Sequence, residues 1–160
     1  MPQPDPAEFR RAVSRFATGV TLVAVRCRDD RIVAMTANSF TSVSLAPPTV
    51  LISVTQGRTL KAIEESGRFA VNVLPASSRK LSDHFAGRRV PGLVPEFEDI
   101  AGSPRLAGAI AHFDCRVERS VAVADHTVLI GTVRDCRHLD AEPLVFYGSR
   151  YRNLAIGPPA

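Results

Sequence analysis

Short runs of β-branched and apolar residues, separated by turn residues, recur along most of this chain and constrain its fold more than any other feature. Such runs predict strands. They cover residues 20–27, 32–37, 49–55, 68–74, 109–123, 125–139 and 143–147. Most successive strands have no helix between them, which favours hairpins over a doubly wound parallel sheet. We therefore expect a mainly β fold, a β-barrel with peripheral helices, which also leaves few strand edges exposed.

The N-terminal segment carries a helical pattern. Asp5 is placed to act as N-cap, Pro6 occupies the first helical position, and Glu8 completes a capping box. We expect Gly19 to end this helix. The N-terminal helical segment, including the few residues before Asp5, would then cover residues 1–19. Its apolar residues share one face, which should pack on a sheet. They are Phe9, Ala12, Val13 and Phe16.

Two further short helices are predicted. The stretch 57–67 has Thr59 as its expected N-cap and a glycine at its end, and the stretch 77–87 has Ser77 or Ser78 as its cap. Residues 88–105 mix proline, glycine and charge, which predicts a long surface loop. With 160 residues and no repeat or linker, the chain is expected to form a single domain, 1–160, ending in a short tail at 155–160.

The charge and the cysteines exclude several classes of protein. The net charge is +4, but the arginines are scattered, Trp is absent and Tyr occurs twice, which argues against nucleic-acid binding. No apolar run reaches the roughly 20 residues of a membrane span, and no secretory signal is visible. Cys27, Cys115 and Cys136 show no metal-binding spacing. We expect a cytoplasmic protein with packed thiols and no membrane partner.

Familiar catalytic motifs are missing from the sequence. It contains no GxSxG, HExxH, GxGxxG or GxxxxGK[ST] pattern, and its four histidines are isolated from one another. No metal site is therefore expected. The excess of positive charge instead suits a small anionic ligand such as a phosphorylated cofactor, and that cofactor would then carry out the difficult chemical step.

The segment MTANSFTSVSLAPP, residues 35–48, is unusually rich in small hydroxyl and amide side chains. Such groups could hydrogen-bond the polar edge of a flat aromatic ring system, and their small size would let a ring approach the backbone. Alternatively, the run is an edge strand whose hydroxyls are satisfied locally. Farther along, Arg58 stands beside a helix start, and helix starts attract phosphate.

Several segments together resemble the flavin reductase-like family. They are FRRAVSRFATGVTLV, MTANSFTSVSLAPPTVLISV, SGRFAVNVL, LSDHFAG, GSPRLAGAIAHFDC, ADHTVLIGTV and PLVFYGSRYRNL, and they span almost the whole chain. The TANSFTSVSL run with its double proline is the most specific of them. The resemblance implies an FMN-binding split β-barrel, a homodimer, and the reductase component of a two-component flavin-dependent monooxygenase.

The resemblance also implies roles for individual residues. The flavin ring and ribityl would be lined by Thr36, Ala37, Asn38, Ser39 and Phe40, with Ser53, Val54 and Thr55 continuing the wall. The phosphate would be held by Arg58 and Thr59, and the flavin site would be closed by His84 and Phe85. The nicotinamide would meet Asp125 and His126, together with a tail that runs from Tyr147 to Tyr151. By default, however, His126 is a packed histidine, His84 a surface one, and Asp125 an acid that simply orients His126.

The chain departs from the family pattern at two places. Glycine is usual where Ala124 stands, and the tail commonly has arginine and then glycine where this chain has Gly148 and Ser149. Three functions stay open. The first is NAD(P)H-dependent reduction of FMN or FAD, which supplies a separate monooxygenase with reduced flavin. The others are a flavin-retaining oxidase or oxygenase acting on a small organic substrate, and a flavin-binding module without turnover.

Overall fold

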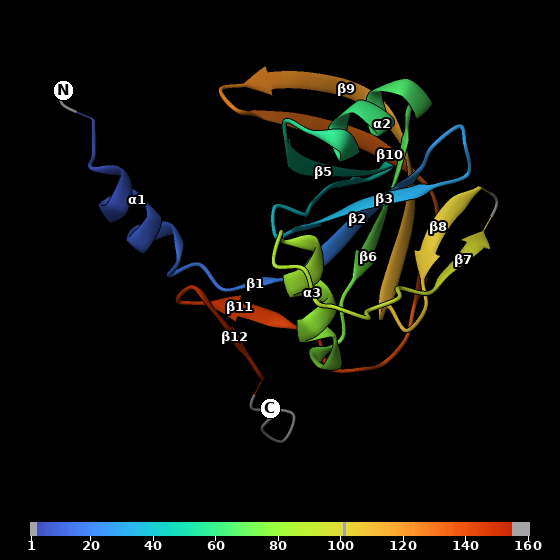
Figure 1. Ribbon diagram of the computed structural model, residues 1–160. Helices are drawn as coiled ribbons and strands as arrows, with labels where there is room; N and C mark the ends of the chain where they lie inside the picture. Colours follow the sequence, from blue (N-terminus) through green and yellow to red (C-terminus); the bar gives the residue numbers. More distant parts are fainter. Residues whose placement is uncertain (1–2, 101, 155–160) are drawn as a thin grey trace.

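The computed structural model describes residues 3–100 and 102–154. Its body is a seven-stranded sheet in which every pairing is antiparallel (Figure 1). In chain order its strands are β2 (Thr21–Arg26), β3 (Ile32–Ala37), β4 (Thr41–Leu45), β5 (Pro48–Thr55), β6 (Arg68–Val73), β9 (Ala111–Val123) and β10 (His126–His138). The predicted tail at 155–160 lies outside the described residues.

The sheet curls into a barrel that stays open along one side. The spatial order is β3-β2-β6-β9-β10-β5-β4, and the two end strands form no ladder with each other in the part of the chain that the structure describes. Successive strands pair as hairpins in three cases, namely β2 with β3, β4 with β5, and β9 with β10. The expected split β-barrel with peripheral helices is confirmed.

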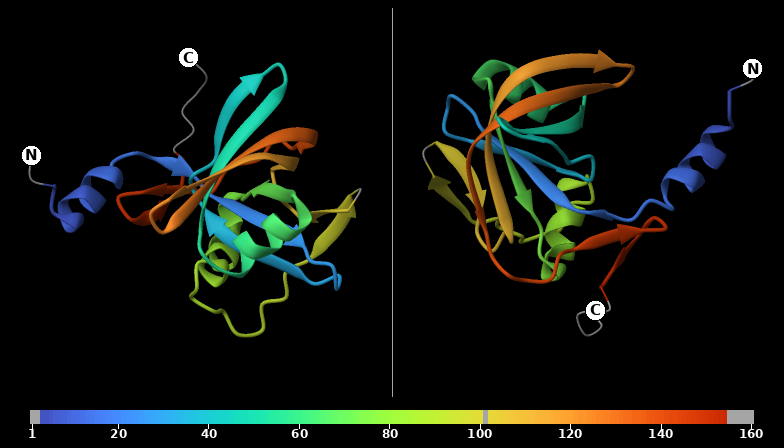
Figure 2. Two further views of the ribbon diagram at one scale, coloured as in Figure 1. Left: turned by 90° about the horizontal axis from the view of Figure 1, so that it is seen from above. Right: turned by 180° about the vertical axis from the view of Figure 1, so that it is seen from behind.

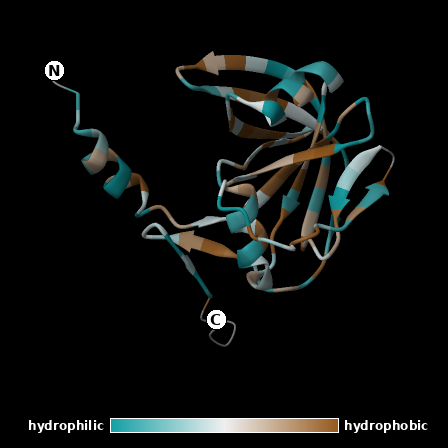
Figure 3. Ribbon diagram, in the orientation of Figure 1, coloured by the Kyte–Doolittle hydropathy of each residue, from teal (hydrophilic) through white to brown (hydrophobic). Residues whose placement is uncertain are grey.

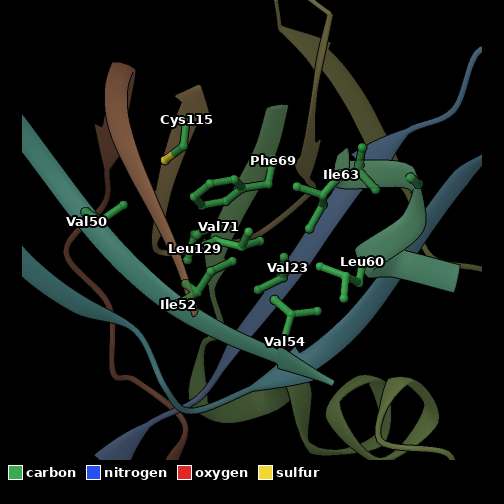
Figure 4. Packing of buried hydrophobic residues seen from close by; sticks show 12 residues of the cluster. Val23, Val50, Ile52, Val54, Leu60, Ile63, Phe69, Val71, Cys115 and Leu129 are labelled. Atoms are coloured by element: carbon green, nitrogen blue, oxygen red, sulfur yellow. The ribbon is translucent and has the colours of Figure 1, made fainter. Parts of the chain in front are cut away.

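Apolar side chains from both halves of the barrel meet in its interior (Figure 4). Alternate residues of each strand point inward, and helix α2 (Arg58–Ser66) adds three more apolar side chains. The labelled members of this core are Val23, Val50, Ile52, Val54, Leu60, Ile63, Phe69, Val71, Cys115 and Leu129. Burial raises the pKa of the Cys115 thiol to about 12, so this cysteine is a packed thiol, as predicted.

Two smaller sheets flank the barrel. One has the order β1-β11-β12 and consists of β1 (Thr18–Gly19), β11 (Val145–Tyr147) and β12 (Arg150–Arg152). The other pairs β7 (Phe97–Ile100) with β8 (Ser103–Leu106). The prediction of a long surface loop over 88–105 is therefore wrong in its second half, where this hairpin forms. The side chain of Asn72 accepts the backbone N–H of Leu106 at 2.9 Å, which pins this hairpin to β6.

The N-terminal helix differs from its prediction in two respects. Helix α1 spans Pro6–Val13, with Asp5 capping it through the Glu8 N–H, but it ends well before Gly19. Residues 18–19 pair with β11 instead, and Ser14 O accepts the Gly148 N–H, so long-range pairing ends the helix early. No residue of α1 is buried, and the helix extends away from the barrel in both views (Figures 1 and 2). Its apolar face does not pack on the sheet.

The third helix lies against the outer side of the barrel wall. It consists of a 3-10 turn, Ala76–Ser78, followed by α3 (Arg79–Phe85). Ser78 occupies the N-cap position of α3, as predicted, but its side chain forms no hydrogen bond with a backbone N–H at the start of the helix. Helix α3 contacts β3, and helix α2 contacts β2 and β3. The two helices thus leave a stretch of β3 between them.

Candidate functional site

A hollow of about 600 Å³ lies over β3, between the start of α2 and the end of α3. Its lining comprises Arg31, Ile32, Val33, Ala34, Arg58, Thr59, His84, Phe85, Gly87 and Arg89. The structure thus brings together Arg58, Thr59, His84 and Phe85, four residues that the sequence assigns to one ligand. They come from two helices that β6 separates in the chain, and β3 forms the floor.

The lining of this hollow is strongly positive. Three guanidinium groups line it, those of Arg31, Arg58 and Arg89, and no carboxylate does. Arg31 donates to Asp29 at 2.7 Å, and this bond lowers the pKa of the Asp29 carboxyl. Within residues 3–100 and 102–154, Arg58 and Arg89 form no ion pair. Two unneutralised guanidinium groups facing one hollow favour a doubly charged anion such as a phosphate monoester.

Thr59 has a different local role from the one predicted. The N-cap of α2 is Gly57, and Thr59 lies one residue inside the helix with its side chain buried. The prediction that Thr59 caps the helix is wrong, because the N-cap lies two residues earlier, at Gly57. Thr59 still borders the hollow, at the N-terminal end of α2, where the backbone N–H groups have no partner within the helix.

His84 is held in one orientation by the backbone beside it. Its Nδ1 accepts the N–H of Val90 at 3.1 Å, and its ring packs edge-on against Phe85. Because Nδ1 is an acceptor in this bond, the proton of the neutral ring resides on Nε2. His84 therefore offers an N–H donor to the hollow that it lines.

A second hollow, of about 180 Å³, lies on the other side of α3 and is lined by three of the predicted ligand residues, Thr36, Ala37 and Asn38. Thr36 donates its hydroxyl to Ser82 O at 2.7 Å, so this group is already used within the protein. Asn38 is exposed, and its amide forms no hydrogen bond in the described part of the chain. The Asn38 amide can therefore hydrogen-bond the polar edge of a ligand.

The open side of the barrel is bridged by two of the predicted wall residues. Ser39 Oγ donates to Ser53 O at 3.0 Å and accepts from Ser53 N at 2.9 Å. This pair ties the loop after β3 to β5. Phe40 stacks against Phe113 with ring centroids 5.1 Å apart and packs on the core. Val54 is fully buried in that core, so its side chain lines no hollow.

A cluster that the sequence did not single out links the C-terminal strands to α3. The Tyr151 hydroxyl lies 2.8 Å from Ser82 Oγ and donates to Asp83 Oδ1 at 3.1 Å. Asp83 in turn accepts from Arg88 at 2.5 Å. Tyr151 thus borders the second hollow and is held there by Ser82 and Asp83. Tyr147 is exposed at the end of β11 and lines neither of the two hollows.

The predicted acid and histidine lie at the tip of the β9–β10 hairpin. Asp125 occupies the turn, and His126 opens β10 opposite Thr55 in the neighbouring strand. Gln56 N donates to Asp125 O at 3.3 Å, so the hairpin tip adjoins the segment that leads into α2. Asp125 and His126 contact each other, as the orienting interpretation requires.

Both departures from the family pattern lie in left-handed backbone. The φ angle is 51° at Ala124 and 60° at Ser149, and these are positions where glycine is favoured. Gly148 also has a φ of 60°, so the β11–β12 turn has positive φ at both central residues, as a type I′ turn requires. The alanine and the serine therefore keep the turn geometry rather than shifting it, at a cost in strain.

Residues 3–100 and 102–154 contain no group of three or more metal-ligating side chains. No helix among them is long and apolar enough to cross a membrane.

Comparison with known proteins identifies the chain's relatives. Residues 13–155 match the model of the flavin reductase like domain. The chain is 40% identical over 156 residues to the NADH-dependent flavin reductase StyB of Pseudomonas fluorescens, covering 95% of this chain and 92% of that protein. It is 35% identical over 148 residues to the reductase component of 4-hydroxyphenylacetate 3-monooxygenase from Thermus thermophilus, covering 91% and 95%. A solved structure of the flavin reductase PheA2 in its native state superposes with a TM-score of 0.92 at 37% identity, covering 96% of this chain and 100% of that one.

Proposed function

The chain belongs to the flavin reductase like domain family, and from this premise we propose that it reduces free FMN or FAD with NADH or NADPH. The observation that carries the proposal is the hollow between α2 and α3, where Arg58 and Arg89 face a space without a carboxylate. NADH is the favoured reductant because it is the one named for the Pseudomonas relative.

The donor set of the site fits a flavin. The phosphate would be held by Arg58 and Arg89, with the Nε2–H of His84 as a further donor. The ring would lie along the loop after β3, where the Asn38 amide has no hydrogen-bond partner among residues 3–100 and 102–154 and small neighbours leave the backbone accessible. Thr36 and Ser39 would support the flavin site indirectly, by holding its wall in place, because their hydroxyls donate to Ser82 O and Ser53 O.

When bound, the flavin supplies the redox chemistry by accepting the hydride that the nicotinamide C4 gives up. The protein's part is positioning, because a hydride passes only between rings that are stacked and aligned. His126 would orient the nicotinamide carboxamide, and Asp125 would fix the imidazole that does so. Tyr151, held by Ser82, would border the hollow beside Asn38.

We propose that the protein works as a homodimer. Helix α1 and the segment that follows it leave Phe9, Val13 and Phe16 exposed at 61%, 54% and 76%, which is unusual for a free monomer. Hydrophobic residues on this projecting helix are visible in brown in Figure 3. The outer half of β9 exposes Val121 and Val123 as well. A second copy that covers these faces would account for them. Replacing Phe9, Val13 and Phe16 by serine should convert a dimer into a monomer in sedimentation experiments, and an unchanged mass would contradict this proposal.

A separate flavin-dependent monooxygenase is the proposed recipient of the reduced flavin. Support comes from the Thermus relative, which is named as the reductase component of a monooxygenase. We propose the cytoplasm as the compartment, since Cys27, Cys115 and Cys136 are all free thiols and disulfides are rare there.

A nicotinamide oxidation assay tests the proposed function. Purified protein is mixed with NADH, or with NADPH, and with added FMN or FAD, and loss of nicotinamide absorbance is followed. Sustained oxidation that depends on added flavin is the expected result. Oxidation only when an organic substrate is also present would indicate an oxygenase, and no oxidation with either nucleotide would indicate a binding module.

A further inference from the structure

The segment 82–90, at the end of α3 and just beyond it, contributes side chains to both hollows. Ser82 and Arg88 line the hollow beside Asn38. His84 and Arg89 line the larger hollow between α2 and α3. This segment is therefore a shared wall, and its conformation decides which groups each hollow presents to a ligand.

Asp83 joins the two ends of the shared wall. Its Oδ1 accepts from the Arg88 guanidinium at 2.5 Å, and its backbone oxygen accepts the Arg88 N–H at 3.0 Å. Gly87, with a φ of 91°, lets the chain turn back after α3 so that both bonds form. The Asp83 side chain is only 24% exposed, so this charge-assisted bond is partly shielded from water.

The bonds of Asp83 fix the backbone beside the two wall residues that face the proposed phosphate position. Arg89 directly follows Arg88, and the Val90 N–H donates to His84 Nδ1 at 3.1 Å. Asp83 itself lines neither hollow. It therefore acts on a ligand there through the residues that it holds and through its charge, and not by contact.

The same carboxylate oxygen also reaches the C-terminal strands. Tyr151 donates its hydroxyl to Asp83 Oδ1 at 3.1 Å, and this hydroxyl lies 2.8 Å from Ser82 Oγ. The Arg79 guanidinium, at the start of α3, lies 5.5 Å from the centre of the Tyr151 ring. Tyr151 thus supplies a second donor that orients the carboxylate toward the wall.

Resting on the proposed function, we propose that Asp83 is a positioning residue for flavin binding. Through Arg88 it holds the shared wall so that Arg89 and His84 face the flavin phosphate. A purely electrostatic effect of Asp83 has the opposite sign, because a carboxylate repels a phosphate and its removal alone would strengthen binding. The direction of the change in affinity therefore separates positioning from simple charge.

Asp83→Asn tests this role, because asparagine keeps the size of the side chain and removes its charge. Dissociation constants for FMN and riboflavin are measured by fluorescence titration, and kcat is measured at saturating flavin and NADH. FMN should bind about three- to tenfold more weakly, since Arg89 is displaced and not removed. Riboflavin has no phosphate, so its affinity should stay at the wild-type value, as should kcat. A general loss of structure would instead weaken both flavins alike.

Two further variants test the partners of Asp83. Arg88→Gln should also weaken FMN, and the double variant with Asp83→Asn should be no weaker than Arg88→Gln alone, because both changes break one bond. Tyr151→Phe should weaken FMN less than Asp83→Asn does, because the bond to Arg88 remains. Strictly additive losses in the double variant would contradict a role of Asp83 through Arg88.

Asp140→Asn is the matched control for charge, since it removes a carboxylate from an exposed position that lines neither hollow. It should change neither flavin affinity. Unchanged or tighter binding of FMN by Asp83→Asn, or an equal loss for riboflavin, would overturn the positioning role and leave the reductase proposal intact. Failure of the wild-type protein to bind either flavin would refute the proposed function itself.

Discussion

His126 Nδ1 lies 2.8 Å from Asp125 Oδ1 at the tip of the β9–β10 hairpin. The hydrogen bond from His126 lowers the pKa of Asp125, so the carboxylate is ionised throughout the neutral range and acts as the acceptor. Nδ1 of the imidazole is therefore its donor, and Nε2 of the neutral ring is left as an acceptor. Such an acceptor suits the N–H of a carboxamide.

Replacement of His126 should affect the nicotinamide cofactor and not the flavin. We expect His126→Ala to lower kcat/KM for NADH by about 10- to 100-fold, because a misplaced nicotinamide ring is no longer aligned with the flavin for hydride transfer. Flavin affinity, measured by fluorescence titration, should stay at the wild-type value. Asp125→Asn should have a smaller effect in the same direction, since an amide can favour the other tautomer. Unchanged kinetics with NADH would refute the assignment of His126.

The guanidinium of Arg58 should contribute to the binding of any flavin that carries a phosphate. Arg58→Gln is expected to raise the dissociation constants of FMN and FAD by about tenfold or more, since a charge-assisted hydrogen bond is lost. Riboflavin, which lacks the phosphate, should bind both proteins alike. Arg134→Gln serves as the control for net charge. A loss of riboflavin binding equal to that of FMN would show that Arg58 supports the fold and not the phosphate.

Ala124 offers a test of backbone strain beside the predicted catalytic pair. Its φ of 51° disfavours a side chain, so Ala124→Gly should stabilise the protein by up to about 1 kcal/mol. Ala122→Gly, two residues earlier in β9, should instead destabilise it, because glycine weakens a regular strand. The changes in unfolding free energy of the two variants, measured by urea unfolding, should have opposite signs if the turn is strained. They should have the same sign if it is not.

Gly131 is required by close packing in the core. A Cβ atom at this position would lie 2.7 Å from the ring of Phe69 and 3.1 Å from Arg116 O. Gly131→Ala should therefore cost about 1 to 3 kcal/mol of unfolding free energy. Gly19→Ala is the matched control, because a Cβ there would meet nothing within 4 Å. Equal stabilities of the two variants in chemical denaturation would contradict the packing described here.

His112 should make stability depend on pH. The residue is buried, its Nδ1 donates to Asn72 Oδ1 at 3.0 Å, and desolvation lowers its pKa below the ordinary 6.5. The unfolded chain then binds a proton more readily than the folded one. Stability is therefore full above pH 6.5 and falls as the pH drops toward the folded pKa, by at most about 1.4 kcal/mol per pH unit.

The variant His112→Asn isolates this effect. Asparagine keeps a donor for Asn72 and cannot be protonated in this range, so its slope of unfolding free energy between pH 6.5 and 5 should be flatter than that of the wild type. A lower overall stability of the variant does not affect the comparison, which uses slopes alone. Identical slopes would show that His112 does not titrate differently in the two states.

Local patterns predicted the barrel well because β-branched runs and turn residues carry their own structural preference. They failed where distant partners decide the outcome. The residues before Gly19 look helical, yet pairing of residues 18–19 with β11 ends the helix early. Likewise, Gly102 and Pro104 are typical of a loop, yet β8 forms at Ser103–Leu106. The side chain of Asn72, from another strand, binds the Leu106 N–H and holds β8 in place.

The candidate site was predictable where residues share a short motif and not where the fold assembles it. Asp125 and His126 are neighbours in sequence, and the structure keeps them in contact. Arg89 escaped notice because it belongs to a segment that looked like an ordinary charged loop, and only the end of α3 brings it opposite Arg58. Ser82 was likewise invisible, since its link to Tyr151 spans 69 positions of the chain.

Reduction of free flavin under anaerobic conditions tests the central claim most directly. A small amount of protein is mixed with excess NADH and a large molar excess of FAD, and the visible absorption of oxidised flavin is followed. The account predicts that the whole flavin pool is bleached in a reaction that depends on the protein. Bleaching that stops at one flavin per protein chain, or that does not occur at all, would contradict it.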